Sequence, residues 1–278
     1  MVGKRPSWYV KYNVGFDENG KLNGLDMDWY SDPGFSPNGS YVFFAINFFD
    51  NVYKCDNYLI KPIVVNTNKP ASTEVRSPDV LSSYSATEQI IEHIAHYLNK
   101  DPLEVRQVNF FSNGDKTAQG HLLTNIDTHN IVNNLLKDCE YHKRKQEIEQ
   151  FNKLNKYKKR GISVMPLRYA MTYELGYYNA LVSVRHSDGS VAVSHGGIEM
   201  GQGLSTKVAQ VCAHELGIPL EKVSVKSTNN LVNPNALWTG ASVTSELCCR
   251  VIKFKFKIII LKALISYTNR VLLKHVKF

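Results

Sequence analysis

The feature that most constrains this chain is a run of four glycines within eight positions, from Gly196 to Gly203. The run joins a hairpin pattern over 181–193, with a turn at Asp188-Gly189, to an amphipathic helix pattern over 205–216. Glycines between a strand and a helix start let another group approach the backbone closely, and the free N–H groups there favour an anion. Composition alone does not distinguish a tight structural turn from a ligand-binding loop.

The text of the run, "GGIEMGQG", narrows the alternatives. It is neither G-x-G-x-x-G nor G-x-x-x-x-G-K-[ST], so neither a dinucleotide fold nor a P-loop follows. Gln202 lies between two glycines, where its amide can both donate and accept hydrogen bonds.

A second stretch, "WTGASVTSE" over 238–246, repeats this organisation, with small residues before Thr244, Ser245 and Glu246 at an apparent helix start. Capping of that helix by Ser and Thr is the structural alternative. Two such helix starts in one lobe favour a shared anionic ligand.

The rest of the chain interleaves strand and helix patterns, which predicts an α+β class. A hairpin is expected over 8–30 with its turn at Asn19-Gly20, and Pro-rich and aromatic-rich text over 31–75 predicts loops and short strands. An amphipathic helix is expected over 86–99, and a short helix follows with Asp101 as its N-cap. A third helical region covers about 127–157. Its expected inward residues are Ile131, Leu135, Ile148, Phe151 and Leu154.

Composition limits the partners. Lys and Arg total 33 against 25 Asp and Glu, a net charge of +8 that suits an anionic ligand. No aromatic-and-basic pattern specific to nucleic acid is present, so no nucleic-acid partner is expected. The five cysteines show no metal-ligand spacing, which indicates free thiols in a reducing compartment. No long uncharged apolar window occurs, so we expect a soluble cytoplasmic protein with no membrane partner.

The last segment, "KFKFKIIILKALISYTNRVLLKHVKF", differs from the text before it. Phe254, Phe256 and Ile258 alternate with lysines, a pattern prone to edge-strand pairing.

Much of the chain resembles one known family. "DGSVAVSHGGIEMGQGLSTKVAQVCAHELGIPLEKVSVKSTNNL", "PNALWTGASVTSE", "KKRGISVMPLRY", "IIEHIAHYLNKDPLEVRQVNF" and "VGKRPSWYVKYNVGFDENGKLNGLDMD" closely resemble the molybdopterin-binding region of aldehyde oxidases and xanthine dehydrogenases, and within it the insect aldehyde oxidases. The resemblance covers about residues 2–250. It implies a two-lobed α+β fragment, with the first lobe and connecting helices over 1–160, the start of the second over 161–250, and a divergent tail over 251–278.

The resemblance implies roles for particular residues. Met200, Gly201, Gln202 and Gly203 would line the pterin, and Ala241, Ser242, Val243 and Thr244 would cradle the pterin and its phosphate. Arg76 and the backbone of Ala241 would lie near the molybdenum without serving as side-chain ligands. Arg5 and Tyr173 would bind substrate. A surface salt bridge for Arg76 and a core position for Tyr173 are the structural alternatives.

The chemistry implied is hydroxylation of an aldehyde or aza-aromatic ring at a molybdenum-molybdopterin cofactor. In the full-length family enzymes, which are homodimers, electrons leave through 2Fe-2S clusters and FAD. This chain shows no cysteines for such clusters, no flavin domain and no counterpart of the family's general-base glutamate, so we expect it to be inactive alone. The alternative is a non-catalytic truncated remnant that acts at most as an interaction module.

One departure from the family lies beside Arg76. Asp79, Ser82 and Ser83 stand where Gly, Glu and Gly are usual in the insect oxidases. If the glycine is needed for a positive φ, its replacement costs about 1 kcal/mol.

Overall fold

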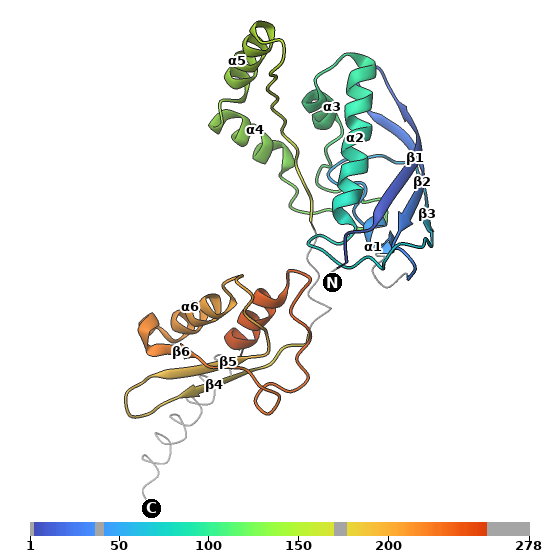
Figure 1. Cartoon of the computed structure of the whole chain (residues 1–278). Helices are drawn as coiled ribbons and strands as arrows, with labels where there is room; N and C mark the ends of the chain where they lie inside the picture. Colours follow the sequence, from blue (N-terminus) through green and yellow to red (C-terminus); the bar gives the residue numbers. More distant parts are fainter. Residues whose placement is uncertain (1–2, 37–41, 170–176, 255–278) are drawn as a thin grey trace, which may run out of the picture. The chain divides into compact units, whose positions relative to one another are not determined.

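The chain divides into two compact units, Met1–Tyr169 and Ala170–Phe278. The computed structural model describes residues 3–36, 42–169 and 177–254. Each unit has a three-stranded mixed sheet with helices packed on it (Figure 1). In both units an antiparallel hairpin precedes a third strand that runs parallel to the second one. The α+β class expected from the sequence is confirmed.

The sheet of unit 1 is formed by β1 (Ser7–Phe16), β2 (Leu22–Asp32) and β3 (Tyr58–Val64), in that order. The turn between β1 and β2 contains Gly20, whose φ of 86° is readily adopted by glycine, and its amide donates to the Asp17 carbonyl oxygen at 2.9 Å. The predicted hairpin is therefore confirmed. β3 lies in the region over 31–75, for which loops and short strands are expected.

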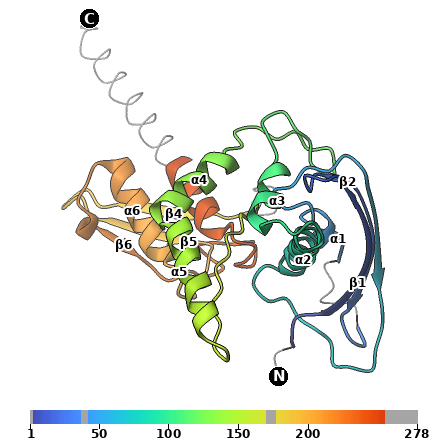
Figure 2. The same ribbon diagram turned by 90° about the horizontal axis from the view of Figure 1, so that it is seen from above.

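Helix α2 (Val80–Leu98) covers one face of this sheet, and the sheet curves around it (Figure 2). Ile90, Ile91 and Ile94 are buried from α2, and they join Met27 and Trp29 of β2 in one core cluster. The predicted spacing is confirmed, but the helix begins six residues before the predicted range over 86–99. Its first turns are fixed by tertiary contacts, because buried Ser83 donates a hydrogen bond to the Ala45 carbonyl oxygen at 2.8 Å.

Two shorter helices complete this core, α1 (Val42–Ile46) and α3 (Pro102–Val108). The Asp101 carboxylate accepts from the Leu103 amide at 2.8 Å, which confirms the predicted N-cap of α3.

The third helical region is two helices, α4 (Thr128–Asp138) and α5 (Tyr141–Leu154), separated at Glu140 with a φ of 50°. The predicted inward face is wrong. Ile131, Leu135 and Leu154 are exposed, and Ile148 and Phe151 are half-buried. The buried residues of α4 are Val132 and Leu136, one position further along, because two i, i+4 pairs compete on this helix and tertiary packing selects the second.

A buried polar cluster in unit 1 holds the chain beyond α5. The Asn51 side-chain amide donates to Glu88 at 2.8 Å and to the Pro166 carbonyl oxygen at 3.0 Å. The side-chain oxygen Oδ1 of Asn51 accepts from the main-chain amide of Arg168 at 3.0 Å. The Arg168 guanidinium also forms an ion pair with buried Asp50. Glu88 is in turn paired with Arg106 at 2.8 Å, so these buried charges are compensated.

Unit 2 has its own sheet and core. Its strands are β4 (Ala180–Val184), β5 (Val191–His195) and β6 (Val223–Val225), and its labelled helices are α6 (Leu204–Leu216) and the short 3-10 helix η2 (Leu220–Lys222). Residues 244–254 form a further helix on the same side of the sheet as α6 (Figure 1). The core cluster contains residues of β5, α6 and this last helix: Val191, Val193, Val208, Cys212, Leu247, Cys248 and Ile252. The hairpin, α6 and the helix start at Thr244 were all predicted correctly.

The edge strand that the alternation of Phe and Lys predicts is wrong for the first residues of this pattern, because Lys253 and Phe254 are helical. Lys253 pairs with Glu215 of α6 at 3.2 Å, so this end of the helix is tied to its neighbour. The remaining tail, 255–278, lies outside the described residues, as does Tyr173. Among the helices that the structure describes, none is long and apolar enough to cross a bilayer.

Candidate functional site

The two glycine-containing helix starts of unit 2 lie against each other. A Cβ added to Gly197 would be 2.6 Å from Leu204 Cδ2 at the start of α6 and 2.7 Å from Thr244 Cγ2 at the start of the last helix. Such distances are too short for any side chain, so Gly197 lets the two helix starts and the end of β5 pack together. We call residues 196–203 the first opening and residues 239–244 the second opening.

Polar contacts also join the two openings. The Ile198 amide donates to Thr239 Oγ1 at 2.8 Å, and Lys207 Nζ on the first turn of α6 lies 3.4 Å from Ser245 Oγ. The adjacency of the two openings, expected from their shared organisation, is therefore confirmed. Lys207 also places a positive charge beside the second opening.

The four glycines of the first opening do different things. Close packing leaves no room for a side chain at Gly196 or Gly197. A Cβ added to Gly196 would be 2.7 Å from Ala236 Cβ. Gly201 and Gly203 have φ values of 100° and 75°, and a Cβ added to either would meet no atom within 4 Å. The first pair thus serves the structure, whereas the second pair combines a left-handed backbone with open space.

Glu199 occupies the N-terminus of α6 from within the chain. Its Oε1 accepts from the amides of Gly201 at 3.0 Å and Gly203 at 2.9 Å, and its Oε2 accepts from the Ser205 amide at 2.9 Å. These hydrogen bonds, with that from Ser205 the strongest, lower the pKa of the Glu199 carboxyl from 4.5. The amides of Gly201, Gly203 and Ser205 are therefore already paired with a carboxylate.

The Gln202 side chain fastens the same loop. Its Oε1 accepts from the Met200 amide at 2.6 Å, and its Nε2 donates to the Ile198 carbonyl oxygen at 2.8 Å. Because the amide nitrogen carries two hydrogens, one donor remains beyond this contact.

The second opening is built differently. Ala241 and Ser242 have φ values of 53° and 61°, left-handed conformations that non-glycine residues seldom adopt. Such outliers concentrate at ligand-binding positions because the surrounding structure must impose them. Within the described parts of the chain, the amides of these two residues donate no hydrogen bond.

The next two residues of the second opening face inward. Val243 is 2% exposed and belongs to the core cluster. The Thr244 hydroxyl lies 2.9 Å from the Tyr178 hydroxyl and accepts from the Gly240 amide at 3.2 Å. Their side chains hold the opening together, so a ligand there would meet their backbone.

Large apolar side chains surround the two openings at the surface. Ile198, Met200 and Trp238 are 57%, 67% and 59% exposed. Trp238 lies over Gly240, where an added Cβ would be 2.3 Å from the indole ring. The rim therefore offers apolar contact beside the unpaired amides.

Two titratable groups beneath the openings are neutral. Burial lowers the pKa of His195, the last residue of β5, from 6.5, although Glu199 nearby opposes the shift. Burial also raises the pKa of the Cys248 thiol to about 11. Neither group brings charge into the site at pH 7.

In unit 1 the structure brings Arg5 to the segment containing Arg76. The Arg5 guanidinium donates to the Arg76 carbonyl oxygen at 2.8 Å and to the Ser77 carbonyl oxygen at 3.0 Å. The Arg76 side chain is exposed. Asp79 has a φ of 52°, so the condition under which replacing the family's glycine is costly is met at this position.

Sequence reasoning missed Glu199, Thr239 and Trp238. An acidic residue just before a glycine-rich helix start is a recognisable signal, because carboxylates are stabilised there. The Thr239 contact spans 41 positions and depends on tertiary structure alone.

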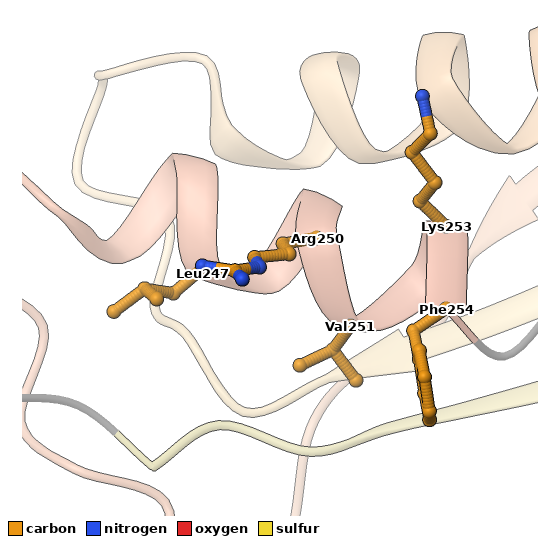
Figure 3. Close-up of a pocket in the computed structure, with 5 residues that line it drawn as sticks. All are labelled: Leu247, Arg250, Val251, Lys253 and Phe254. Carbon is orange, nitrogen blue, oxygen red and sulfur yellow. The ribbon is translucent and has the colours of Figure 1, made fainter. Parts of the chain in front are cut away.

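A separate hollow lies along the last helix, lined by Leu247, Arg250, Val251, Lys253 and Phe254 (Figure 3). It borders residues that the structure does not describe. Within the described chain, no group of three or more His, Cys, Asp or Glu side chains could hold a metal ion.

Comparison with known proteins identifies the family of the chain. The molybdopterin cofactor-binding domain family matches residues 1–110 and again residues 134–265. The chain is 37% identical over 251 residues to a xanthine dehydrogenase of Oryza sativa subsp. japonica, covering 88% of this chain and 18% of that protein. It is 35% identical over 252 residues to a xanthine dehydrogenase of Calliphora vicina, covering 89% and 19%. The chain thus spans less than a fifth of the length of these curated relatives.

Solved structures show the same fold. Quinoline 2-oxidoreductase from Pseudomonas putida 86 matches with a TM-score of 0.72 and 19% identity, over 92% of this chain and 35% of that one. Aldehyde oxidoreductase from Desulfovibrio gigas matches with a TM-score of 0.70 and 18% identity, over 90% and 28%. The chain belongs to the molybdopterin cofactor-binding domain family, and its fold is like that of the molybdopterin-binding domains of molybdenum hydroxylases.

Proposed function

We propose that the two openings of unit 2 together bind the pterin and phosphate of a molybdenum-molybdopterin cofactor, as part of an oxidoreductase that hydroxylates aldehydes or N-heterocycles. The observation that carries this proposal is the contact between the two openings at Gly197, with strained and unpaired backbone at Ala241 and Ser242. A cradle of main-chain donors suits a cofactor that is held without protein thiolate or imidazole ligands.

The described residues fit such a group. Gly201 and Gly203 leave space for a flat ring system to approach the backbone, and Met200 offers an exposed apolar side chain beside them. Gln202 keeps one amide hydrogen for an acceptor on the ligand. The cofactor, when bound, supplies the redox-active metal centre for the oxidation.

The second opening would hold the anionic part of the cofactor. Among the described residues the amides of Ala241 and Ser242 donate no hydrogen bond, whereas the Val243 amide lies 3.4 Å from the Gly240 carbonyl oxygen. Thr244 begins a helix whose dipole favours negative charge. Lys207 adds a cation beside them. In this proposal Ala241 lies near the metal through its backbone.

Substrate binding is proposed for Arg5 and Tyr173, and a position on the cofactor side, near the metal, is proposed for Arg76. Arg5 would steady charge on the substrate and Arg76 would lie beside the metal. The relatives named xanthine dehydrogenase act on a purine, whereas structural neighbours are named for quinoline and aldehyde oxidation, so an aldehyde or an aza-aromatic ring is the proposed substrate class. An insect aldehyde oxidase type is the finer proposal.

Further properties follow from the same proposal. In the full-length enzyme, 2Fe-2S clusters and FAD would carry electrons away from the molybdenum. That enzyme would be a homodimer in the cytoplasm. Size-exclusion chromatography with light scattering would measure whether this chain self-associates. The alternative of a non-catalytic remnant has no support from the family matches.

Reconstitution of the purified full chain with molybdenum cofactor tests the proposal. We expect molybdenum and pterin to be retained in equal molar amounts, and Gly203→Val to lose both, because a β-branched residue does not accept a φ of 75°. A wild-type chain that retains neither would overturn the cofactor assignment. Oxidation of an aromatic aldehyde with an artificial electron acceptor would contradict the expectation that no residue of this chain serves as general base.

A further inference from the structure

We propose that Glu199 is a positioning residue for the cofactor, which closes the N-terminus of α6 to phosphate and so directs the anionic part of the cofactor to the second opening. This inference rests on the proposed function. It concerns which of two neighbouring helix starts is available to an anion, and why.

The first step is the geometry of the Glu199 carboxylate. It accepts three main-chain N–H groups, from Gly201, Gly203 and Ser205, all between 2.9 and 3.0 Å. Ser205 lies in the first turn of α6, Gly203 is its N-cap residue, and Gly201 lies in the loop before it. Because the carboxylate belongs to the same loop, an external anion would have to displace it before it could reach these donors.

The second step is charge. A phosphate that approached the start of α6 would meet the fixed negative charge of Glu199 as well as occupied donors, and like charges in one site repel. At the second opening, Glu246 also places a carboxylate in the first turn of the helix, but among the described residues no carboxylate accepts from the amides of Ala241 and Ser242. Lys207 of α6 adds a positive charge there, with its Nζ 3.4 Å from Ser245 Oγ.

The third step is the loop itself. Glu199 binds the amides on both sides of Gln202, while Gln202 fastens Met200 and Ile198. The carboxylate therefore fixes the backbone on which Met200 and Gln202 are presented. Glu199 would act through these residues, without touching the cofactor itself.

Amide chemical shifts of the full chain during titration with inorganic phosphate test the assignment. In the wild type we expect the amides of Ala241 and Ser242 to shift, while those of Gly203 and Ser205 do not. In Glu199→Gln the amides of Gly203 and Ser205 should also shift, and they should saturate within the range of phosphate concentrations over which the wild-type amides stay unchanged. Unchanged amide shifts in β4 and β5 would show that the variant is folded.

Two further variants sharpen the test. Glu221→Gln in η2 removes the same charge away from the openings and should match the wild type. Glu199→Asp keeps the charge and should leave Gly203 and Ser205 less responsive than Glu199→Gln does. After reconstitution, Glu199→Gln should also retain less pterin than Glu221→Gln, because its loop is less fixed.

The assignment is overturned if phosphate shifts Gly203 and Ser205 equally in the wild type and in Glu199→Gln. Failure of the proposed function gives a different signature. Ala241 and Ser242 would then stay unresponsive in every variant, whatever happens at Gly203 and Ser205.

Discussion

The Arg5 guanidinium bridges two successive carbonyl oxygens, those of Arg76 at 2.8 Å and Ser77 at 3.0 Å. Two segments 71 residues apart in the sequence are thereby joined at Arg5, for which the family resemblance implies substrate binding, and Arg76, for which it implies a position near the molybdenum. Ser77 and Asp79 both have positive φ values, so the segment that follows Arg76 has a strained backbone that needs such support.

Replacing Arg5 by Lys should loosen this segment. One ammonium cannot reproduce the two-pronged geometry of a guanidinium, so we expect the free energy of unfolding to fall by about 1 kcal/mol. Hydrogen exchange at residues 76–79 should accelerate in Arg5→Lys but not in Arg185→Lys, whose exposed side chain lies on the hairpin loop of unit 2. Equal hydrogen-exchange rates at residues 76–79 in the two variants would show that the Arg5 hydrogen bonds do not stabilise this segment.

Glycine substitutions should separate packing from backbone conformation in the first opening. Gly197→Ala must push apart Leu204 and Thr244, and we expect a loss of about 1–3 kcal/mol in the free energy of unfolding. Gly203→Ala meets no atom and should lose about 1 kcal/mol for its left-handed φ alone. Gly161→Ala, which faces open space without a positive φ, is the neutral control, and denaturant unfolding measures all three. A Gly197→Ala chain as stable as the control would refute the interlocked openings.

The Thr244 hydroxyl should stabilise the second opening through Tyr178 and Gly240. Thr244→Val keeps the side-chain shape and removes both contacts. The Gly240 amide loses its acceptor, while the Tyr178 hydroxyl keeps its hydrogen bond to the Trp238 carbonyl oxygen at 3.0 Å, so we expect a cost of about 1 kcal/mol. Tyr178→Phe and the double variant complete a thermodynamic cycle. A coupling energy indistinguishable from zero would mean that the two hydroxyls act independently.

Burial of neutral His195 predicts a pH dependence of stability. Because its folded-state pKa is lowered from 6.5, the unfolded chain binds the proton more readily. The free energy of unfolding should therefore be unaffected above that value and should fall as the pH drops from 6.5 toward the lower folded-state pKa. His195→Asn should remove this part of the slope, whereas His186→Asn on the exposed turn should keep it. Identical pH profiles for the two variants would contradict the buried neutral imidazole.

The elements with clear periodicity could be predicted from the sequence. The alternation of Trp8, Val10 and Tyr12 gave the first hairpin, and the glycine before α6 gave its start. The inward face of α4 could not be chosen, because Ile131 with Leu135 and Val132 with Leu136 have the same spacing and packing decides between them.

The candidate site was predictable in part. The positions of the two openings could be predicted from their glycines and small residues. Their contact through Gly197 depends on the tertiary fold. The sequence did not reveal that one opening is filled by Glu199, because the three amides that it accepts converge only in the folded loop. The positive φ at Asp79 was accessible because the resemblance places a glycine there.

The central claim is that both openings hold one ligand, and amide-shift mapping of the isotope-labelled chain during titration with molybdenum cofactor tests it most directly. The account predicts that the amides of Met200 and Gly201 shift together with those of Ala241 and Ser242 and saturate at the same cofactor concentration. Shifts confined to one opening, or two sets that saturate at different concentrations, would contradict it.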